Sequence, residues 1–375
     1  MEFFKPRDTI DFMKYRGPII SGSLLLALLG FLSVFYPGPN YGIDFKGGTE
    51  VQLHFKKDID SSTVRKTLAD VGYDAEVVNV EGRANEYLVR VGRVSSLPAD
   101  KIQAIKKSIN WSIAGVKLDE LKVSPGGDKI TLRMRDSVDP QAIDTALKKA
   151  GANVQRVSAF GSSEQHRYEA QLVGVANEMI DSLKARLGDA APDEPLRVEW
   201  VGPKAGRQLR DAAIKSLLWT VLFIMAYVAM RFDLRFAPGG IIALLHDALI
   251  TVLVFVVTRR EINLSTVAAL LTILGYSIND TIVIFDRIRE NMTRMRDASL
   301  YHLINVSTTQ TLSRSILTSF VTLLSILPFL IWGTPVIRDF AFALVIGMVV
   351  GSYSTIYIAS PFTEWMDKKL FPKAS

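Results

Sequence analysis

The chain contains no cysteine, and this absence excludes disulfide bonds, thiol catalysis and cysteine-ligated zinc sites. It leaves the redox compartment open. Histidine is scarce, with 4 in 375 residues, and His54 and His166 stand isolated in the polar part of the chain. That part shows neither a Ser–His–Asp spacing nor a metal-ligand cluster. We therefore predict that the protein is not an enzyme and binds no metal or cofactor.

Long apolar runs are absent between about Asp44 and Arg210, which reads as water-soluble protein. They crowd the C-terminal half, and one lies near the start, although the chain as a whole is only 49% hydrophobic. The net charge of +6 would suit nucleic acid, but Lys and Arg on the cytoplasmic side of membrane spans are the simpler explanation. We predict a membrane protein with no nucleic-acid partner.

Six apolar runs are long enough to cross a bilayer as helices, which needs about 20 residues each. The first is too long for a signal peptide, and a poor cleavage site follows it. Pro328 lies inside the fifth run and predicts a kink there. The six predicted spans cover residues 17–36, 212–230, 236–258, 262–285, 310–333 and 340–360.

Lys and Arg in the short loops between spans predict the orientation of the chain in the membrane, because such residues are enriched on the cytoplasmic side. Basic residues precede the first span, lie between the second and third, follow the fourth and end the chain, whereas the other face has only Arg259, Arg260 and Arg338 in its short loops. Both termini are therefore expected in the cytoplasm and the large polar domain outside the cytoplasmic membrane, which is the periplasm in a cell with an outer membrane (there the membrane is the bacterial inner membrane). The expected divisions are an N-terminus at 1–16, the first helix at 17–36, the periplasmic domain at 37–210, a five-helix bundle at 211–365 and a tail at 366–375.

The polar domain contains an internal repeat at an offset of 79 positions, with copies at about 50–125 and 129–204. Each copy has an alternating strand, a helix preceded by an Asp N-cap (Asp60 or Asp139), and a glycine at the helix end (Gly72 or Gly151). Further strands and a second amphipathic helix follow in each copy. The predicted fold class is a polytopic α-helical membrane protein whose periplasmic domain is α+β, built of tandem ferredoxin-like modules with antiparallel sheets.

A glycine-rich segment, residues 42–49, follows the first span. It resembles a phosphate loop, but Gly48 replaces the lysine that the loop needs, so nucleotide binding is not expected. Two interpretations remain open and are compatible: a tight turn beside a strand, and a hinge between membrane helix and soluble domain. The hinge or turn residues are Gly42, Asp44, Gly47, Gly48 and Thr49.

Ionisable residues inside a span are costly, so they are candidates for function. The candidates for a proton path include Asp280 and its neighbour Asn279 in the fourth span, and Arg314, which enters the fifth span among hydroxyl residues. We expect Asp280 and Arg314 to form a proton-responsive pair, with Ser277 and Arg287 on the same face as Asp280; alternatively, Arg314 snorkels and Asp280 is structural. His246 and Asp247 in the third span belong either to the same relay or to an interhelical hydrogen bond.

Small residues recur at every fourth position of the sixth span, which allows close approach of another helix. They include Ala343, Gly347, Gly351 and Thr355.

The chain resembles the SecD/SecF family of protein-export membrane proteins, and within that family its motifs are similar to those of the SecF branch. The resemblance rests on the glycine-rich segment at 42–49, Val-Gly-Pro-Lys-Ala-Gly at 201–206, His246-Asp247, the long motif at 275–291 and Thr-Gln-Thr-Leu-Ser-Arg at 309–314. The usual external domain of the family is a single module, whereas this chain has the module twice.

The resemblance implies a half-bundle that pairs with SecD and associates with the SecYEG channel, with YajC and YidC as further partners. It implies that proton flow drives the translocation of an unfolded preprotein, with Asp280 and Arg314 on the proton path. The alternatives are half of a proton-driven exporter of lipids or small molecules, and a passive scaffold.

Overall fold

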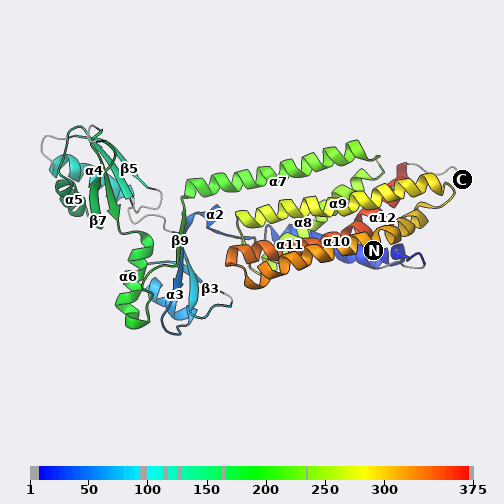
Figure 1. The fold of residues 1–375 in the computed structure, drawn as a ribbon, viewed down its shortest axis with the longest axis horizontal. Helices are drawn as coiled ribbons and strands as arrows, with labels where there is room; N and C mark the ends of the chain where they lie inside the picture. The colour runs from blue at the N-terminus through cyan, green and yellow to red at the C-terminus, as the bar shows by residue number, and fades with distance from the viewer. Residues whose placement is uncertain are drawn as a thin grey trace. The chain divides into compact units, whose positions relative to one another are not determined.

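The computed structural model describes residues 8–80, 82–92, 99–112, 117–124, 129–162, 165–233 and 235–370. The chain divides into two compact units, one formed by Met1–Gly42 with Asp211–Ser375 and the other by Ile43–Arg210. The first unit is helical and the second is α+β (Figure 1).

Within the described residues, six helices are long and apolar enough to cross a membrane, which confirms the number of predicted spans. Several extend beyond the apolar runs because charged and polar residues continue the same helices. The helices are α1 (Arg16–Ser33), α7 (Pro203–Arg231), α8 (Ala237–Val257), α9 (Leu264–Arg294), α10 (Leu300–Trp332) and α11 (Pro335–Ser354). A short 3₁₀ turn, η1 (Phe12–Tyr15), precedes α1, and α11 continues through a π-helical turn, η4 (Thr355–Ala359), into α12 (Ser360–Leu370).

Local sequence explains where these helices begin. Asn263 caps α9 by accepting a hydrogen bond from the Thr266 N–H, and Ser299 caps α10 through the His302 N–H. Pro335 occupies the first turn of α11, where its missing N–H costs nothing. Pro328 lies inside α10, as the sequence indicates.

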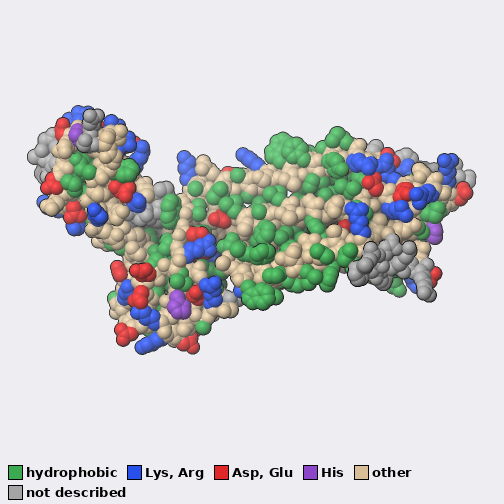
Figure 2. Space-filling model, in the orientation of Figure 1, with side chains coloured by type: hydrophobic (Ala, Val, Ile, Leu, Met, Phe, Trp, Pro, Cys, Tyr) green, Lys and Arg blue, Asp and Glu red, His purple; other side chains and the backbone are tan. Residues whose placement is uncertain are grey.

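The helical unit has an inner and an outer set of helices. Half or more of the apolar stretch is buried in α8 (50%), in α9 (56%) and in the continuous helical stretch Pro335–Leu370 that begins with α11 (56%). In α1, α7 and α10 the buried share is 22% or less. Hydrophobic side chains spread along this unit on the face drawn in Figure 2, while Lys, Arg, Asp and Glu gather toward one end of its helices. Large apolar side chains exposed on the outer helices include Leu25, Phe31, Leu218, Phe223, Phe320 and Trp332.

The α+β unit contains two four-stranded sheets, and every strand pair in them is antiparallel. The first sheet has the order β3-β4-β2-β9 and the second β5-β6-β8-β7. The first contains β2 (Gly48–His54), β3 (Ala75–Asn79), β4 (Glu86–Val91) and β9 (Arg197–Val201). The second contains β5 (Leu118–Val123), β6 (Lys129–Met134), β7 (Val154–Ala159) and β8 (Arg167–Leu172).

The first helix of each repeat copy forms as predicted. Asp60 accepts a hydrogen bond from the Ser62 N–H at the start of α3 (Ser61–Ala69), and Asp139 accepts one from the Gln141 N–H at the start of α5 (Pro140–Lys149). Gly72 and Gly151, just past these helices, have φ of +87° and +80°, a conformation that favours glycine.

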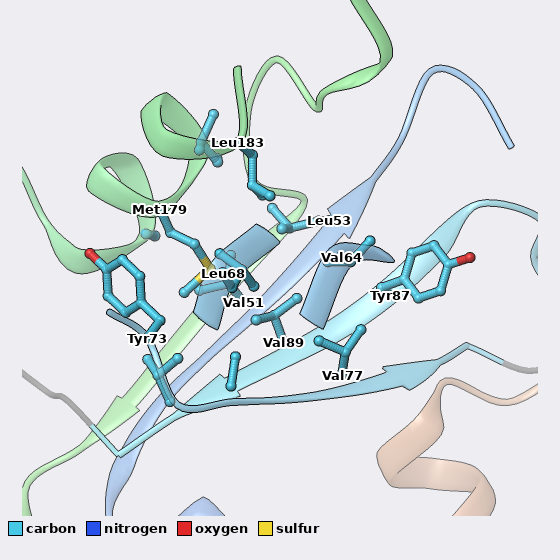
Figure 3. Packing of buried hydrophobic residues seen from close by; sticks show 14 of the residues in the cluster. Val51, Leu53, Val64, Leu68, Tyr73, Val77, Tyr87, Val89, Met179 and Leu183 are labelled. Carbon is cyan, nitrogen blue, oxygen red and sulfur yellow. The ribbon is translucent and has the colours of Figure 1, made fainter. Parts of the chain in front are cut away.

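The tandem arrangement of modules, however, is not what the structure shows, because the two repeat copies exchange their last helix and strand. The first sheet takes β2, β3 and β4 from the first copy but β9 from the second, and the second sheet takes β5 from the first copy. Each exchanged helix packs against the sheet that contains the strand following it in the chain. In Figure 3, Met179 and Leu183 of α6 (Val175–Leu187) pack against Val51 and Leu53 of β2. Ile105 of α4 (Ala99–Ser112) lies in the core of the second sheet.

Local sequence does not decide this exchange, because both second helices, α4 and α6, are amphipathic and either could cover either sheet. The structural modules are residues 48–91 with 175–201, and a contiguous piece at 99–172 inserted between them.

Candidate functional site: two polar clusters beside α9

The first cluster surrounds Asp247 of α8, which is fully buried. Its Oδ2 accepts hydrogen bonds from Ser277 Oγ of α9 at 2.5 Å and from Ser354 Oγ of α11 at 2.9 Å. Its Oδ1 lies 2.9 Å from Nδ1 of the neighbouring His246. Next to it, the hydroxyls of Thr281 and Thr355 lie 3.0 Å apart. The carboxylate thus joins the three inner helices.

The His246 ring is also buried. It packs edge-on against Tyr353, with ring centroids 5.8 Å apart, and its Nε2 has no hydrogen-bond partner among the described residues. The Tyr353 hydroxyl accepts a hydrogen bond from Ser23 Oγ of α1 at 3.2 Å. The cluster therefore extends to the first span.

Two glycines of α11 make this cluster possible because they have no side chain. A Cβ on Gly351 would lie 3.2 Å from the Ser277 Cβ and 3.5 Å from Asp247 Oδ2, and one on Gly347 would lie 2.3 Å from the Ile273 Cδ1. The small-residue row of the sixth span thus faces α9, through Gly347, Gly351 and Thr355; Ala343, in the same row, is buried. The sequence alone left open which helix the row meets.

The second cluster lies between α9 and α10. Asp280 is buried, at 8% exposed, and accepts a hydrogen bond from Ser315 Oγ at 3.3 Å. Arg314, next to Ser315, is exposed on α10, and no ion pair joins it to Asp280 in the described part of the chain. Asn279 is exposed as well. Asp280 and Arg314 thus lie on neighbouring helices, α9 and α10, and their side chains do not contact each other.

Hydroxyl groups continue from this second cluster across three helices. The Tyr276 hydroxyl donates to Ser319 Oγ at 3.2 Å, and Ser319 Oγ lies 3.2 Å from Ser352 Oγ of α11. These groups form a polar line inside otherwise apolar helices.

Two expected neighbours of Asp280 lie elsewhere. Ser277 donates to Asp247 instead, and Arg287 pairs with Glu290 and donates to Gln310. The reason is helix geometry: residues three or seven apart lie on one face of a helix, but each side chain bonds to the partner within its reach, on its own helix or on a neighbouring one. Sequence reasoning missed Ser315 and Ser354, and the signal for both was a hydroxyl residue within an apolar span.

The glycine-rich segment lies where the chain passes between the two units, whose boundary falls between Gly42 and Ile43. A one-turn helix, α2 (Ile43–Lys46), contains Asp44, and β2 then begins at Gly48 and includes the buried Thr49. Gly47 and Gly48 have φ of +77° and +135°, and a Cβ on Gly48 would lie 2.6 Å from the Val91 carbonyl oxygen. Only glycine fits this turn.

Six spans, carboxylates buried between them, and a large α+β unit after the first span define the class: a multi-pass α-helical membrane protein. The model of the SecD/SecF C-terminal family matches residues 183–369, and the model of the SecD/SecF GG motif matches residues 33–59. The GG match contains the glycine-rich turn.

Full-length relatives agree with this class. The chain is 33% identical to the protein translocase subunit SecF of Magnetococcus marinus, over 98% of this chain and 95% of that one. It is 32% identical to SecF of Pseudomonas aeruginosa, over 96% and 92%. The chain belongs to the SecF family of protein translocase subunits, and is thus a multi-pass protein of the bacterial inner membrane.

Solved structures support the fold. The crystal structure of SecDF from Thermus thermophilus, described as a translocon-associated membrane protein, matches with a TM-score of 0.66 and 30% identity, over 95% of this chain and 38% of that chain. A super-membrane-facing form of SecDF matches with a TM-score of 0.58 and 29% identity, over 98% and 40%. The chain thus spans less than half the length of the SecDF chains that it matches.

Proposed function

We propose that this chain and a SecD partner use the proton motive force to promote the translocation of unfolded polypeptide across the inner membrane. The observation that carries the proposal is the buried Asp280, which accepts one hydroxyl hydrogen bond and has no cation in contact among the described residues. A carboxylate in a bilayer costs several kcal/mol unless it is paired, hydrated or neutralised by a proton. Such a group suits a step in which a proton binds and leaves.

The outer helices support the need for a partner. Arg314 is exposed on α10, a helix whose outward surface also includes Thr318 and Ser325. A guanidinium and hydroxyls facing lipid would be costly, so a second helical bundle that covers this surface is the favourable arrangement. We assign that role to SecD, with the SecYEG channel as the assembly that the pair serves, and with YajC and YidC as additional partners.

The test is protein translocation into sealed membrane vesicles with an imposed proton gradient. Asp280→Asn keeps the shape of the side chain but cannot be charged, so stimulation by the gradient should be lost while the complex still assembles with SecD. Thr272→Ala, at an exposed position about two turns earlier on α9, is the control and should retain stimulation. Normal gradient-stimulated export by Asp280→Asn would refute the coupling and leave the passive scaffold.

The orientation belongs to the same proposal: both termini in the cytoplasm and the α+β unit in the periplasm, as the positive-inside pattern favours. Because the chain lacks cysteine, single cysteines can be introduced at Ser124 and Ser299 and labelled with an impermeant maleimide. The two sites should react from opposite sides of the membrane. Reaction of both from one side would refute the topology.

A proton-driven exporter of lipids or small molecules is the second candidate, because carboxylates buried between helices serve exporters equally well. Purification distinguishes the two functions. Recovery with SecD supports export of protein, whereas a homo-oligomer that moves a small molecule supports the exporter.

A further inference from the structure

The residues before α1 are fastened to α10. The N–H of Ile10 donates a hydrogen bond to Thr309 Oγ at 3.1 Å, and the N–H of Met13 donates one to Asn305 Oδ1 at 3.1 Å. Asn305 is 4% exposed, so the second bond is buried. We name residues 8–15, which include η1, the strap.

Asp11 gives the strap a third attachment to the same helix. Its Oδ1 accepts hydrogen bonds from Asn305 Nδ2 at 2.8 Å and from the Tyr301 hydroxyl at 2.7 Å. The same carboxylate accepts one from the Lys14 N–H and so caps η1. Tyr301, Asn305 and Thr309 recur at every fourth position, so they form one stripe on α10, and the strap lies along it.

Arg16, the first residue of α1, extends the attachment to a third helix. It forms an ion pair with Glu364 of α12, which is 4% exposed, and its guanidinium lies 5.5 Å from the centre of the Tyr301 ring. Lys368 pairs with the same carboxylate at 2.7 Å. The helices α1, α10 and α12 are thus held together at the end where the chain enters α1.

A polar seam between α9 and α10 leads from Asp280 to the strap. It starts with the hydrogen bond from Ser315, which lies one turn from Thr311 on α10. Farther along, Asn291 Nδ2 of α9 donates to Ser307 Oγ of α10 at 2.8 Å. Asn291 lies about 16 Å from Asp280 along the axis of α9, at the usual helical rise. The seam therefore reaches the part of α10 that the strap covers.

Two observations at this end of the seam indicate that water can reach it and that the strap closes it. Thr308 Oγ, on a side chain that is 1% exposed, has no hydrogen-bond partner among the described residues. Buried hydroxyls normally have a partner, and a water molecule in the seam would supply one. One turn earlier on α10, beside Asn305, Met13 of the strap is 2% exposed and belongs to the buried cluster that contains Ile288 and Ile304. Met13 thus places an apolar side chain where the seam ends.

The helix α10 is suited to move. A share of 11% of its apolar stretch is buried, and its contacts with α9 and α11 include the hydroxyl hydrogen bonds of Ser315 and Ser319. Pro328 removes one backbone hydrogen bond within the helix. Polar contacts of this kind can exchange partners without opening an apolar core.

We propose that the strap is a gate on the seam. It closes the seam while Met13 and Asp11 lie against α10, and it opens, with a shift of α10, in the step in which the proton leaves the Asp280 carboxyl for water in the seam. This inference rests on the proposed function and deepens it by naming where the proton leaves. In the proposed orientation the strap is cytoplasmic, which is the side toward which the proton motive force drives protons.

Labelling of one buried position tests the gate. The cysteine-free chain carrying Met13→Cys, with SecD in inverted membrane vesicles, is treated with an impermeant maleimide from the cytoplasmic side. An imposed proton gradient should raise the labelling rate about tenfold, as for an open state that rises from about 1% to about 10% of the molecules. Tyr15→Cys, at a position of the strap that is 57% exposed, is the matched control and should react equally fast with and without the gradient.

A second variant tests the contact itself. Asn305→Ala removes the acceptor for the Met13 N–H and a donor to Asp11. It should raise the labelling of Met13→Cys without a gradient by about fivefold, the factor that one net hydrogen bond provides, while assembly with SecD is unchanged. Unchanged labelling would show that these bonds do not close the strap, and the proposal would fail.

Closing the strap permanently tests its role in transport. The double variant Ile10→Cys with Thr309→Cys, joined by a cleavable bis-maleimide, should lose the stimulation of translocation by the gradient and regain it after cleavage. Full stimulation in the cross-linked state would overturn the gate, and so would stimulated translocation without any change in Met13→Cys labelling. Both results would leave the proposed function intact, whereas normal stimulation in Asp280→Asn refutes that function itself.

Discussion

The contact between Gly347 and Ile273 provides a quantitative test of the packing in the membrane unit. A Cβ at position 347 would lie 2.3, 2.4 and 2.6 Å from Cδ1, Cγ1 and Cγ2 of Ile273, and the Ile273 side chain is only 1% exposed. Because three atoms of one buried side chain are affected, no simple rotation removes the overlap. Gly347→Ala should therefore destabilise the unit by about 1–3 kcal/mol, the usual cost of overpacking.

The overlap can be separated from other effects by a double-mutant cycle. Ile273→Ala removes all three atoms and should by itself cost about 2–5 kcal/mol through the cavity that it leaves. In its presence Gly347→Ala should cost little, so the two changes should be non-additive by about 1–3 kcal/mol. Gly275→Ala is the control within α9, because nothing lies within 4 Å of an added Cβ there.

The assay is unfolding of the full chain by SDS in mixed micelles, followed by circular dichroism. The reasoning is refuted if Gly347→Ala is no more destabilising than Gly275→Ala, or if the effects of Gly347→Ala and Ile273→Ala simply add.

Two further predictions concern polar groups. In the same assay, Asp247→Ala should destabilise the helical unit by at least about 2 kcal/mol, because it leaves buried hydroxyls without their acceptor. Ser354→Ala, which removes one donor, should cost about 1 kcal/mol, and equal effects of the two changes would contradict the central role of the carboxylate. In the α+β unit, hydrogen bonds from Ser62 hold the pKa of Asp60 below its ordinary value of 3.8. This carboxylate therefore contributes stability above pH 3.8 that is lost as the pH falls through its lower folded-state pKa; Asp60→Asn should make hydrogen exchange in α3 less dependent on pH in that range, and an unchanged dependence would contradict the assignment.

The sequence was a good guide wherever structure is local. Asp60 and Asp139 could be identified as helix caps because an N-cap needs only a short side chain and the next two N–H groups. The spans followed from apolar length alone. Their ends did not, since α9 and α10 continue through charged residues that a hydropathy pattern assigns to loops.

Non-local choices could not be read from the sequence. The exchange between the repeat copies is one of them, because the two second helices, α4 and α6, are amphipathic in the same way and either could cover either sheet. In the candidate site, Asp247 and Asp280 could be recognised as costly residues in spans. Their partners Ser354 and Ser315 could not, because the direction in which a helix side chain points depends on how neighbouring helices pack.

The exchanged arrangement also changes what a truncation would do. Cutting out the second copy as the repeat defines it would remove the edge strand and one helix from the first sheet, and leave β5 and α4 with no sheet to complete. Cutting out the contiguous piece at 99–172 and joining β4 to α6 by a short loop would leave a closed four-stranded module with both of its helices. The duplicated material can thus be regarded as an insert that the host module surrounds, with both attachment points on the host.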